Sequence, residues 1–172
     1  MIRQNSTLKA LLASSALALV SALPAKAQDA TWLANPGSSD FNTGTNWSTG
    51  TVPIGTAFFG ASTITDLAQS ASISLSGWTF GASASYYTFA NSHGLAFTGA
   101  GLVVNGGGIE ITSTSAMAFY NSASAGGASI ENSDALIFSN SSTAGTAGIT
   151  NSGLTTFLDS ATADHAYITN RR

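Results

Sequence analysis

Few residues of this 172-residue sequence carry side chains suited to acid–base or metal chemistry. Cleavage of a polysaccharide needs convergent carboxylates, and a calcium site needs several oxygen ligands at one point. The acidic residues do not recur at a regular interval, so they do not predict an acidic row. They are Asp29, Asp40, Asp66, Glu110, Glu131, Asp134, Asp159 and Asp164.

The histidines and serines give no stronger signal for catalysis. His93 and His165 have no partner at catalytic or metal-binding spacing, so we expect both to face solvent. Glu131 and Asp134 flank one turn, where a lone calcium ion is an alternative to a structural role. No serine lies in a GxSxG elbow, and no GK[ST] follows the glycines at 106–108. We therefore expect no enzymatic activity, no catalytic residues, no metal and no cofactor.

Carbohydrate recognition is a second chemistry that the sequence could support. Trp32 and Trp47 could stack on a glycan, with nearby polar side chains bonding its hydroxyls. The alternative is that this aromatic segment caps the open edge and apolar end of a repetitive fold. We expect the cap, and keep the two tryptophans as candidate glycan contacts. The polar partners of such a site would be Asp40, Asn42 and Asn46.

The secondary structure that positions these side chains can be predicted from a pattern that is repeated three times in the last third of the sequence. The copies read FYNSASAGGASIEN, FSNSSTAGTAGITN and FLDSATADHAYITN, and their corresponding residues are nineteen apart. A fixed period near twenty residues is typical of a solenoid, in which each coil buries its apolar side by stacking on its neighbours. The repeated columns, which we interpret as structural, are Phe119, Phe138 and Phe157; Ile130, Ile149 and Ile168; and Asn132, Asn151 and Asn170.

Each copy contains a short strand in which inward and outward residues alternate. Ala128, Ile130 and Asn132 are two residues apart, so in a strand all three lie on one face. Ser129 and Glu131 lie between them and should face outward. Asparagines stacked in this way can hydrogen-bond along the solenoid.

A turn recurs in each copy at a position that favours a small residue with positive φ. Gly126 and Gly145 occupy it in the first two copies, and Asp164 in the third. Aspartate tolerates left-handed geometry better than most residues. Asp159 replaces an asparagine in another column, and we interpret both aspartates as sequence drift.

Upstream of the regular copies, the alternation of apolar and polar residues predicts degenerate coils. Phe97 and Phe119 are twenty-two residues apart, three more than the later period. We place the excess in a loop that bulges near residues 105–108. The inward pairs expected in this part are Ile73 and Leu75, Trp78 and Phe80, Tyr87 and Phe89, and Leu95 and Phe97.

The first 27 residues have the organisation of a secretory signal peptide. Arg3 and Lys9 precede an apolar run from Ala10 to Leu23, and the small-residue triplet Ala25-Lys26-Ala27 follows it. Cleavage after Ala27 would leave two arginines against eight acids, a net charge of −6. Nucleic acids and anionic lipids are held largely by lysine and arginine, so neither is an expected partner. We expect no transmembrane segment in the mature chain.

The composition favours a repetitive β structure. The sequence has no cysteine, which excludes disulfides and thiolate metal ligands, and only 8% of its residues are charged. It has too many apolar residues at period two to be disordered. We therefore predict an all-β chain with a signal peptide (1–27), an N-terminal β cap with degenerate coils (28–93), and regular coils of about 19 residues (94–172).

The order of several motifs resembles a known family. ATW, DFNTGTNW, TVP and TAFFG are followed by SGWTFGASASYYTF, LAFTGAGLVVN and the repeated F-x-[ND]-S-x-[ST]-A-[GD]-x-A-x-I-x-N. Together they are similar to the N-terminal part of a bacterial autotransporter passenger with autotransporter-associated β-strand repeats. The resemblance covers nearly the whole chain. It implies a right-handed parallel β-helix, exported by the Sec route and displayed at the cell surface by a C-terminal outer-membrane barrel.

The sequence departs from this family after the third copy. No barrel pattern follows it, so we expect a truncated passenger fragment. Expressed alone, such a chain would be periplasmic; within a complete autotransporter it would lie at the outer membrane and cell surface or outside the cell.

Three functions are compatible with these patterns. The first is a non-catalytic structural or adhesive stalk that contacts cell-surface or extracellular ligands. The second is a self-assembling, β-rich secreted protein that associates through the open end of its β-helix. The third is a glycan-binding or polysaccharide-active β-helix with Trp32 and Trp47 as contacts. We expect the first.

Overall fold

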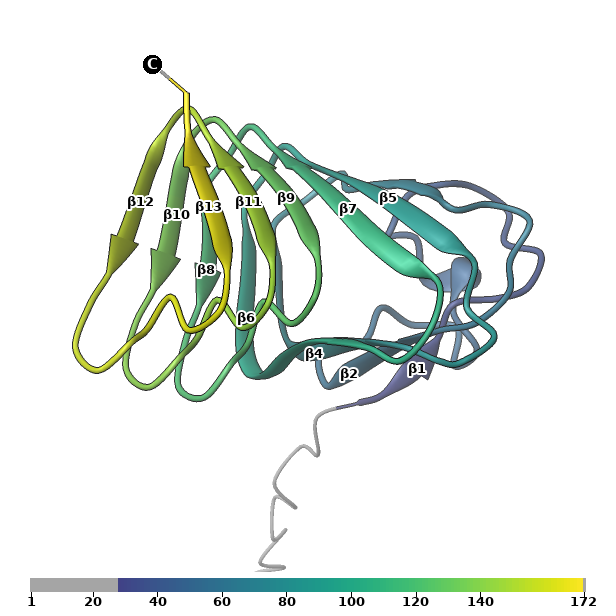
Figure 1. Cartoon of the computed structure of the whole chain (residues 1–172). Coiled ribbons are helices and arrows are strands. Elements are labelled where there is room, and N and C mark those ends of the chain that lie inside the picture. The colour runs from purple at the N-terminus through teal and green to yellow at the C-terminus, as the bar shows by residue number, and fades with distance from the viewer. Residues whose placement is uncertain (1–27, 172) are drawn as a thin grey trace, which may run out of the picture.

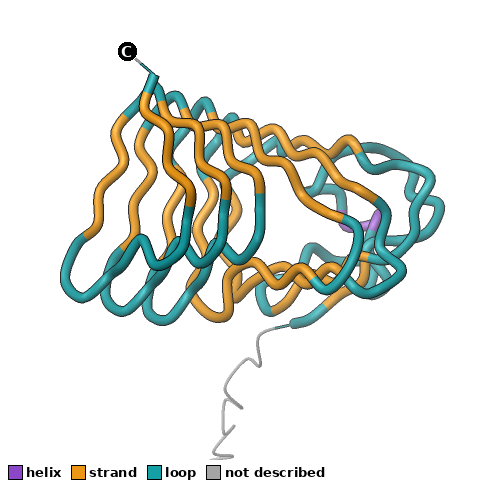
Figure 2. The backbone as a smooth tube through the Cα atoms, viewed as in Figure 1, coloured by secondary structure: helices purple, strands orange, loops and turns teal. Residues whose placement is uncertain are grey.

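The computed structural model describes residues 28–171, which form an all-β solenoid of about five turns. Successive turns stack along one axis, from the N-terminal end to the yellow C-terminal end in Figure 1. Strands form the walls, turns and loops join them, and a short 3-10 helix, η1 (Gly44–Asn46), lies in the N-terminal segment (Figure 2). The predicted signal peptide lies outside the described residues. Within residues 28–171, no helix is long and apolar enough to cross a bilayer.

Two parallel sheets build the walls, and each strand pairs with the equivalent strand of the next turn. The seven-stranded sheet has the order β1-β2-β4-β6-β8-β10-β12, and the six-stranded sheet β13-β11-β9-β7-β5-β3. The first consists of β1 (Ala30–Thr31), β2 (Thr56–Phe59), β4 (Ile73–Phe80), β6 (Leu95–Val104), β8 (Met117–Phe119), β10 (Ala135–Phe138) and β12 (Leu154–Phe157). The second consists of β3 (Asp66–Ala68), β5 (Tyr86–Asn91), β7 (Gly108–Ser113), β9 (Ser129–Asn132), β11 (Gly148–Asn151) and β13 (Tyr167–Asn170).

The pairing register confirms the solenoid predicted from the repeats. Phe119 lies opposite Phe138, and Phe138 opposite Phe157, at the nineteen-residue period. Upstream, Leu75 lies opposite Phe97, and Phe97 opposite Phe119, at twenty-two residues. A slip of one residue would turn every inward side chain outward, so each column of like residues stabilises its own register.

The solenoid turns of twenty-two residues have three residues more than the turns of nineteen, and these additional residues lie mostly in strands. The sequence suggested a bulging loop near residues 105–108, but β6 and β7 instead extend toward each other and leave a tight turn at 105–107. Leu102 and Ile109 lie in these extensions and are buried. Longer strands make a wider turn, which has room for Trp78 in its interior.

A third and shorter ladder marks one corner of the solenoid. Isolated parallel bridges join Gly101 to Ser124, Ser124 to Thr143, and Thr143 to Thr162. Gly101 has a φ of 77°, and a Cβ built there would lie 2.1 Å from the carbonyl oxygen of Ser124. Only glycine allows the backbone to approach so closely at this corner.

The turn predicted to need positive φ is confirmed. Gly126, Gly145 and Asp164 have φ values of 59°, 62° and 51°. Asp164 therefore retains the turn geometry of the glycines that it replaces.

A second column of left-handed turns contains Asn121, Asn140 and Asp159, with φ values of 58°, 60° and 58°. The Oδ1 of Asn140 accepts the Asn121 N–H at 3.0 Å, and the Oδ2 of Asp159 accepts the Asn140 N–H at 2.9 Å. Asp159 therefore continues a ladder of hydrogen-bonded turns. Its interpretation as sequence drift did not predict this role.

The repeated columns point inward as the alternation predicted. Ile130 and Ile149 are each 1% exposed, and Asn132 and Asn151 are also buried. Ile168 in β13 is only partly buried, because no further strand among the described residues packs on its turn.

Residues 28–48 cover the N-terminal end of both sheets. β1 pairs with β2 through Ala30 and Ala57, while a backbone bridge joins Asp40 to Ala68 in β3. Trp32 meets Trp47 across an antiparallel bridge and joins it in the apolar core. This arrangement is the N-terminal cap that the aromatic segment predicted.

Candidate functional site

Asp66 and Glu110 both lie on the outer face of the six-stranded sheet. Asp66 lies opposite Thr88, and Thr88 lies opposite Glu110, so two strand spacings of about 4.8 Å each separate the two acidic residues. The Thr88 hydroxyl donates to Asp66 at 2.7 Å, and the Tyr86 hydroxyl donates to Glu110 at 3.3 Å. At that separation the two carboxylates do not converge on one point.

Both histidines lie at exposed turns. The Nδ1 of His165 lies 2.5 Å from the Oδ1 of Asp164, and the His165 side chain is 84% exposed. His93 meets the Ser92 hydroxyl at 2.9 Å. Among residues 28–171, no three side chains of metal-binding type cluster together.

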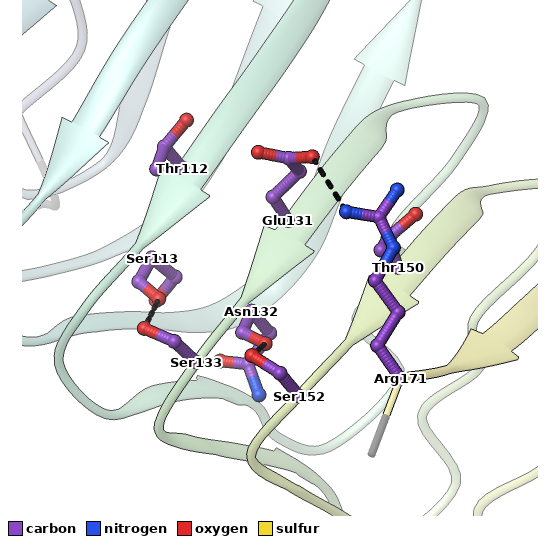
Figure 3. A pocket seen from close by; sticks show the side chains of 8 residues that line it. All are labelled: Thr112, Ser113, Glu131, Asn132, Ser133, Thr150, Ser152 and Arg171. Carbon is purple, nitrogen blue, oxygen red and sulfur yellow. Dashed lines mark hydrogen bonds and ion pairs between the residues drawn. The ribbon is translucent and has the colours of Figure 1, made fainter.

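A small polar hollow of about 130 Å³ lies where β7, β9 and β11 end (Figure 3). Glu131 and Arg171 form an ion pair across it with N···O 4.0 Å. On its other side, the hydroxyls of Ser133 and Ser152 donate to backbone carbonyls of the preceding turn. The hollow is lined by Thr112, Ser113, Glu131, Asn132, Ser133, Thr150, Ser152 and Arg171.

Glu131, one of the two acids considered for calcium, therefore faces a guanidinium. Asp134 does not line the hollow. A hollow of this size has room for ordered water, whereas ligand pockets typically measure about 300 Å³ or more.

A column of buried polar side chains runs through the interior of the solenoid. Gln69 donates to the Oδ1 of Asn91 at 2.9 Å, and Asn91 donates to the Ser113 hydroxyl at 2.8 Å. Further along, Asn132 donates to Asn151 at 2.7 Å, and Asn151 donates to Asn170 at 3.2 Å. The column continues the predicted asparagine ladder into the longer turns. Its buried members are Gln69, Asn91, Ser113, Asn132 and Asn151, and it ends at Asn170, which is exposed in the last described strand.

Sequence reasoning missed the first half of this column. Asn91 and Ser113 are twenty-two residues apart, and Ser113 and Asn132 are nineteen apart. The change of period and of side-chain type hid the alignment, although counting back from Asn132 by nineteen and then twenty-two would have found it. The Ser113 side chain is too short to reach Asn132. Within the described structure, the Oδ1 of Asn132 is therefore buried without a hydrogen-bond partner.

A second internal column consists of stacked phenylalanines. The ring centroids of Phe97 and Phe119 are 5.1 Å apart, and those of the next two pairs are each 4.9 Å apart. Phe138 is tilted by only 6° from Phe119 and by 8° from Phe157. Ring stacking along the axis therefore adds to the backbone ladders that join the turns.

The two tryptophans considered for glycan contact lie inside the cap. Trp32 and Trp47 are each 2% exposed, and their ring centroids are 5.1 Å apart in an edge-to-face pair. The Trp47 Nε1–H donates to the carbonyl of Phe41 at 2.8 Å, and the Trp32 Nε1–H donates to that of Ile64 at 3.1 Å. Neither ring presents a face on which a sugar could stack.

Asn46, considered as a partner for glycan hydroxyls, is engaged inside the cap. It is fully buried, and its Oδ1 accepts the N–H groups of Gly37 and Ser38 at 2.9 and 3.2 Å. Its Nδ2 donates to the Ser38 hydroxyl and to the carbonyl of Asp40, both at 2.9 Å. A buried amide with all these bonds organises the loop around itself.

Asp40 and Asn42 join the cap to the first turn. The Asp40 carboxylate accepts the Ser70 hydroxyl at 2.9 Å and the Ser70 N–H at 3.1 Å, and it also accepts the Thr43 hydroxyl at 2.9 Å. The Oδ1 of Asn42 accepts the N–H groups of Ser70 and Ala71 at 3.0 and 3.1 Å. The polar residues of DFNTGTNW thus form a latch between the cap and the turn after β3.

The hydrogen bonds of this latch shift the titration of Asp40. Burial alone would raise the pKa of its carboxyl group, but hydrogen bonds from the Thr43 and Ser70 side chains and from the N–H groups of Asn42 and Ser70 outweigh that effect. The pKa therefore lies below its ordinary value of 3.8. Because the folded protein holds the charged form, this contribution to stability is present above the unfolded pKa and is lost as the pH falls through the folded pKa.

We expect Asp40→Asn to lower the free energy of unfolding by about 1 kcal/mol at neutral pH and by less in acid. The measurement is denaturant unfolding at pH 7 and at about pH 3. Asp134→Asn, at an exposed acid of the turn before β10 and far from the latch, is the control. An equal loss at both pH values would contradict the role of the carboxylate charge.

No protein-family model matches this sequence, and no match was found among the curated proteins or the solved structures. The functional argument therefore rests on the geometry described above.

Proposed function

We propose that this chain is a non-catalytic structural segment of an exported stalk, of the kind found in autotransporter passengers. The observation that carries the proposal is the pair of internal columns, the stacked phenylalanines and the polar column from Gln69 to Asn170. The side chains at the inward positions hold one turn to the next. Such a chain is suited to be a stiff spacer.

The distribution of reactive side chains supports a non-catalytic role. The carboxylates and imidazoles lie at separate turns and on an outer sheet face, where they contact hydroxyls, one neighbouring side chain or a single guanidinium. Acid–base catalysis would need two such groups converging on one substrate position. At about 4.8 Å per turn, five turns contribute about 24 Å to the length of a stalk.

The proposed export can be tested with the full chain carrying a C-terminal epitope tag in a Gram-negative bacterium. We expect the tag in the periplasmic fraction on a polypeptide whose first residue is Gln28, as read by mass spectrometry. A matched variant, Ala25→Arg with Ala27→Arg, removes the small residues of the expected cleavage site and should leave the longer precursor. A cytoplasmic product that still begins at Met1 would overturn the proposal.

The stalk role predicts resistance of the exported protein to a protease of broad specificity. In a stacked solenoid, most backbone groups are paired with the neighbouring turn, so cleavage must await unfolding. We expect the solenoid to survive proteinase K under conditions that digest a denatured sample of the same protein. Rapid digestion of the native sample would argue against a rigid spacer.

A further inference from the structure

The outer face of the seven-stranded sheet carries no charged side chain between β4 and β12. Its central row follows the strand register directly, and flanking residues continue the face on either side. We call this surface the uncharged face. Its residues are Ser74, Ala96, Ala118, Ile137 and Thr156 in the central row, with Gly94, Ala116, Ala135 and Leu154 on one side and Tyr120 and Leu158 on the other.

One half of the uncharged face is hollow. A depression of about 310 Å³ lies over β4, β6 and β8. Its outer surface is formed largely by Gly94, Ala96, Ala116 and Ala118, whose side chains have one carbon atom or none. The small size of these residues leaves a shallow apolar trough along the sheet.

The other half of the uncharged face is raised. Tyr120 and Ile137 border the trough on the side of the later turns. Beyond them, Leu154 and Leu158 are 65% and 48% exposed, and Tyr120 is 37% exposed. Leu154 lies in the last strand of the sheet and Leu158 directly after it, two turns beyond Tyr120, and together with Ile137 these side chains gather into an apolar patch of the kind found at interaction sites.

A hollow half beside a raised half makes the surface complementary to itself. Rotation by 180° about an axis parallel to the sheet, along the boundary between the two halves, turns a second copy face to face with the first and places its raised half over the hollow half. Two-fold symmetry then creates the same contact twice. We propose that the uncharged face binds a second copy of this chain, with Tyr120 and Ile137 of each copy entering the trough of the other.

The charge distribution favours a second copy as the occupant. Asp66, Glu110 and Glu131 lie on the outer face of the six-stranded sheet, away from the uncharged face. Asp134 and Asp159 lie in the turns next to Ala135 and Leu158, both on the raised half. The two-fold arrangement places these carboxylates over the hollow half of the other copy, so two acidic chains can meet through this surface without bringing like carboxylates together. Like charges placed in the interface would oppose the dimer.

The size of the surface determines how strong this dimer can be. Five strands at about 4.8 Å by five residues at about 3.3 Å cover about 400 Å² on each copy, or about 800 Å² in total. Stable interfaces bury about 1,200 Å² or more. We therefore expect a weak dimer that forms as the concentration rises, whether or not the chain is exported.

The test uses protein purified from cells expressing the full chain, studied by sedimentation equilibrium from about 10 µM to about 1 mM. The average mass should rise toward twice that of the monomer and should not exceed it. Ala96→Arg places a charge in the trough of both copies and should weaken dimerisation at least tenfold. Thr112→Arg, the same kind of change at an exposed position of the six-stranded sheet, should leave dimerisation unchanged.

Circular dichroism and thermal unfolding show whether each variant is folded. A second variant, Tyr120→Ser, removes a raised side chain and should also weaken the dimer. A wild-type protein that stays monomeric at about 1 mM would overturn the proposal. Folded Ala96→Arg and Tyr120→Ser variants that dimerise as strongly as the wild type would also overturn the proposal. A mass that grows beyond the dimer would show association through the ends of the solenoid instead.

Discussion

Trp47→Ala is expected to lower the free energy of unfolding by about 3 to 5 kcal/mol, the range for removing a large buried aromatic side chain. Trp47 packs edge to face against Trp32, Phe41 and Phe59, with centroids 5.1, 4.8 and 5.8 Å apart. Its indole N–H also bonds to the carbonyl of Phe41. Alanine would leave a cavity between the cap and the first turn and would free that carbonyl.

Chemical denaturation of the purified protein measures this effect, and two other variants define its cause. Trp47→Phe keeps an aromatic ring but loses the N–H donor, so we expect a smaller loss than for alanine. Tyr86→Ala removes an aromatic side chain that is 55% exposed and should change stability by less than about 0.5 kcal/mol. A Trp47→Ala protein as stable as the wild type would show that the cap does not depend on this ring.

Asn91→Ala is expected to lower the free energy of unfolding by about 3 kcal/mol or more, through unsatisfied groups rather than lost apolar contact. Asn91 is 1% exposed. Its Oδ1 accepts hydrogen bonds from Gln69 and from the Gly94 N–H, at 2.9 and 3.1 Å. Its Nδ2 donates to the Ser113 hydroxyl and to the carbonyls of Ser115 and Ala116. Each buried group that loses this partner adds to the cost.

Asn105→Ala is the matched control, because it is the same substitution at an exposed position whose side chain is not in the column. Urea unfolding of both variants should show a large loss for Asn91→Ala and little change for Asn105→Ala. Hydrogen exchange should also be faster at amides of the turns next to Asn91, since the column joins those turns. Equal stability of the two variants would contradict a structural role for the polar column.

The sequence by itself determined the solenoid and the inward columns of its regular turns. Phe119, Phe138 and Phe157 recur at one period, and parallel strands that pair at that period must place them in line. The positive φ at Gly126, Gly145 and Asp164 could also be predicted from the sequence, because few residue types tolerate that geometry. Repetition makes both features readable, since each copy gives the same information again.

Only the tertiary structure decided what the non-repeating residues do. Gln69, Asn91 and Ser113 share a column with the repeated asparagines because backbone pairing aligns turns of different length. Trp32 and Trp47 fit a sugar site or a cap equally well by residue type, and the packing of the cap buries both. The trough in the uncharged face exists because small residues from three separate turns become neighbours. Contacts between side chains of different turns depend on that alignment, and a single copy of the repeat does not encode it.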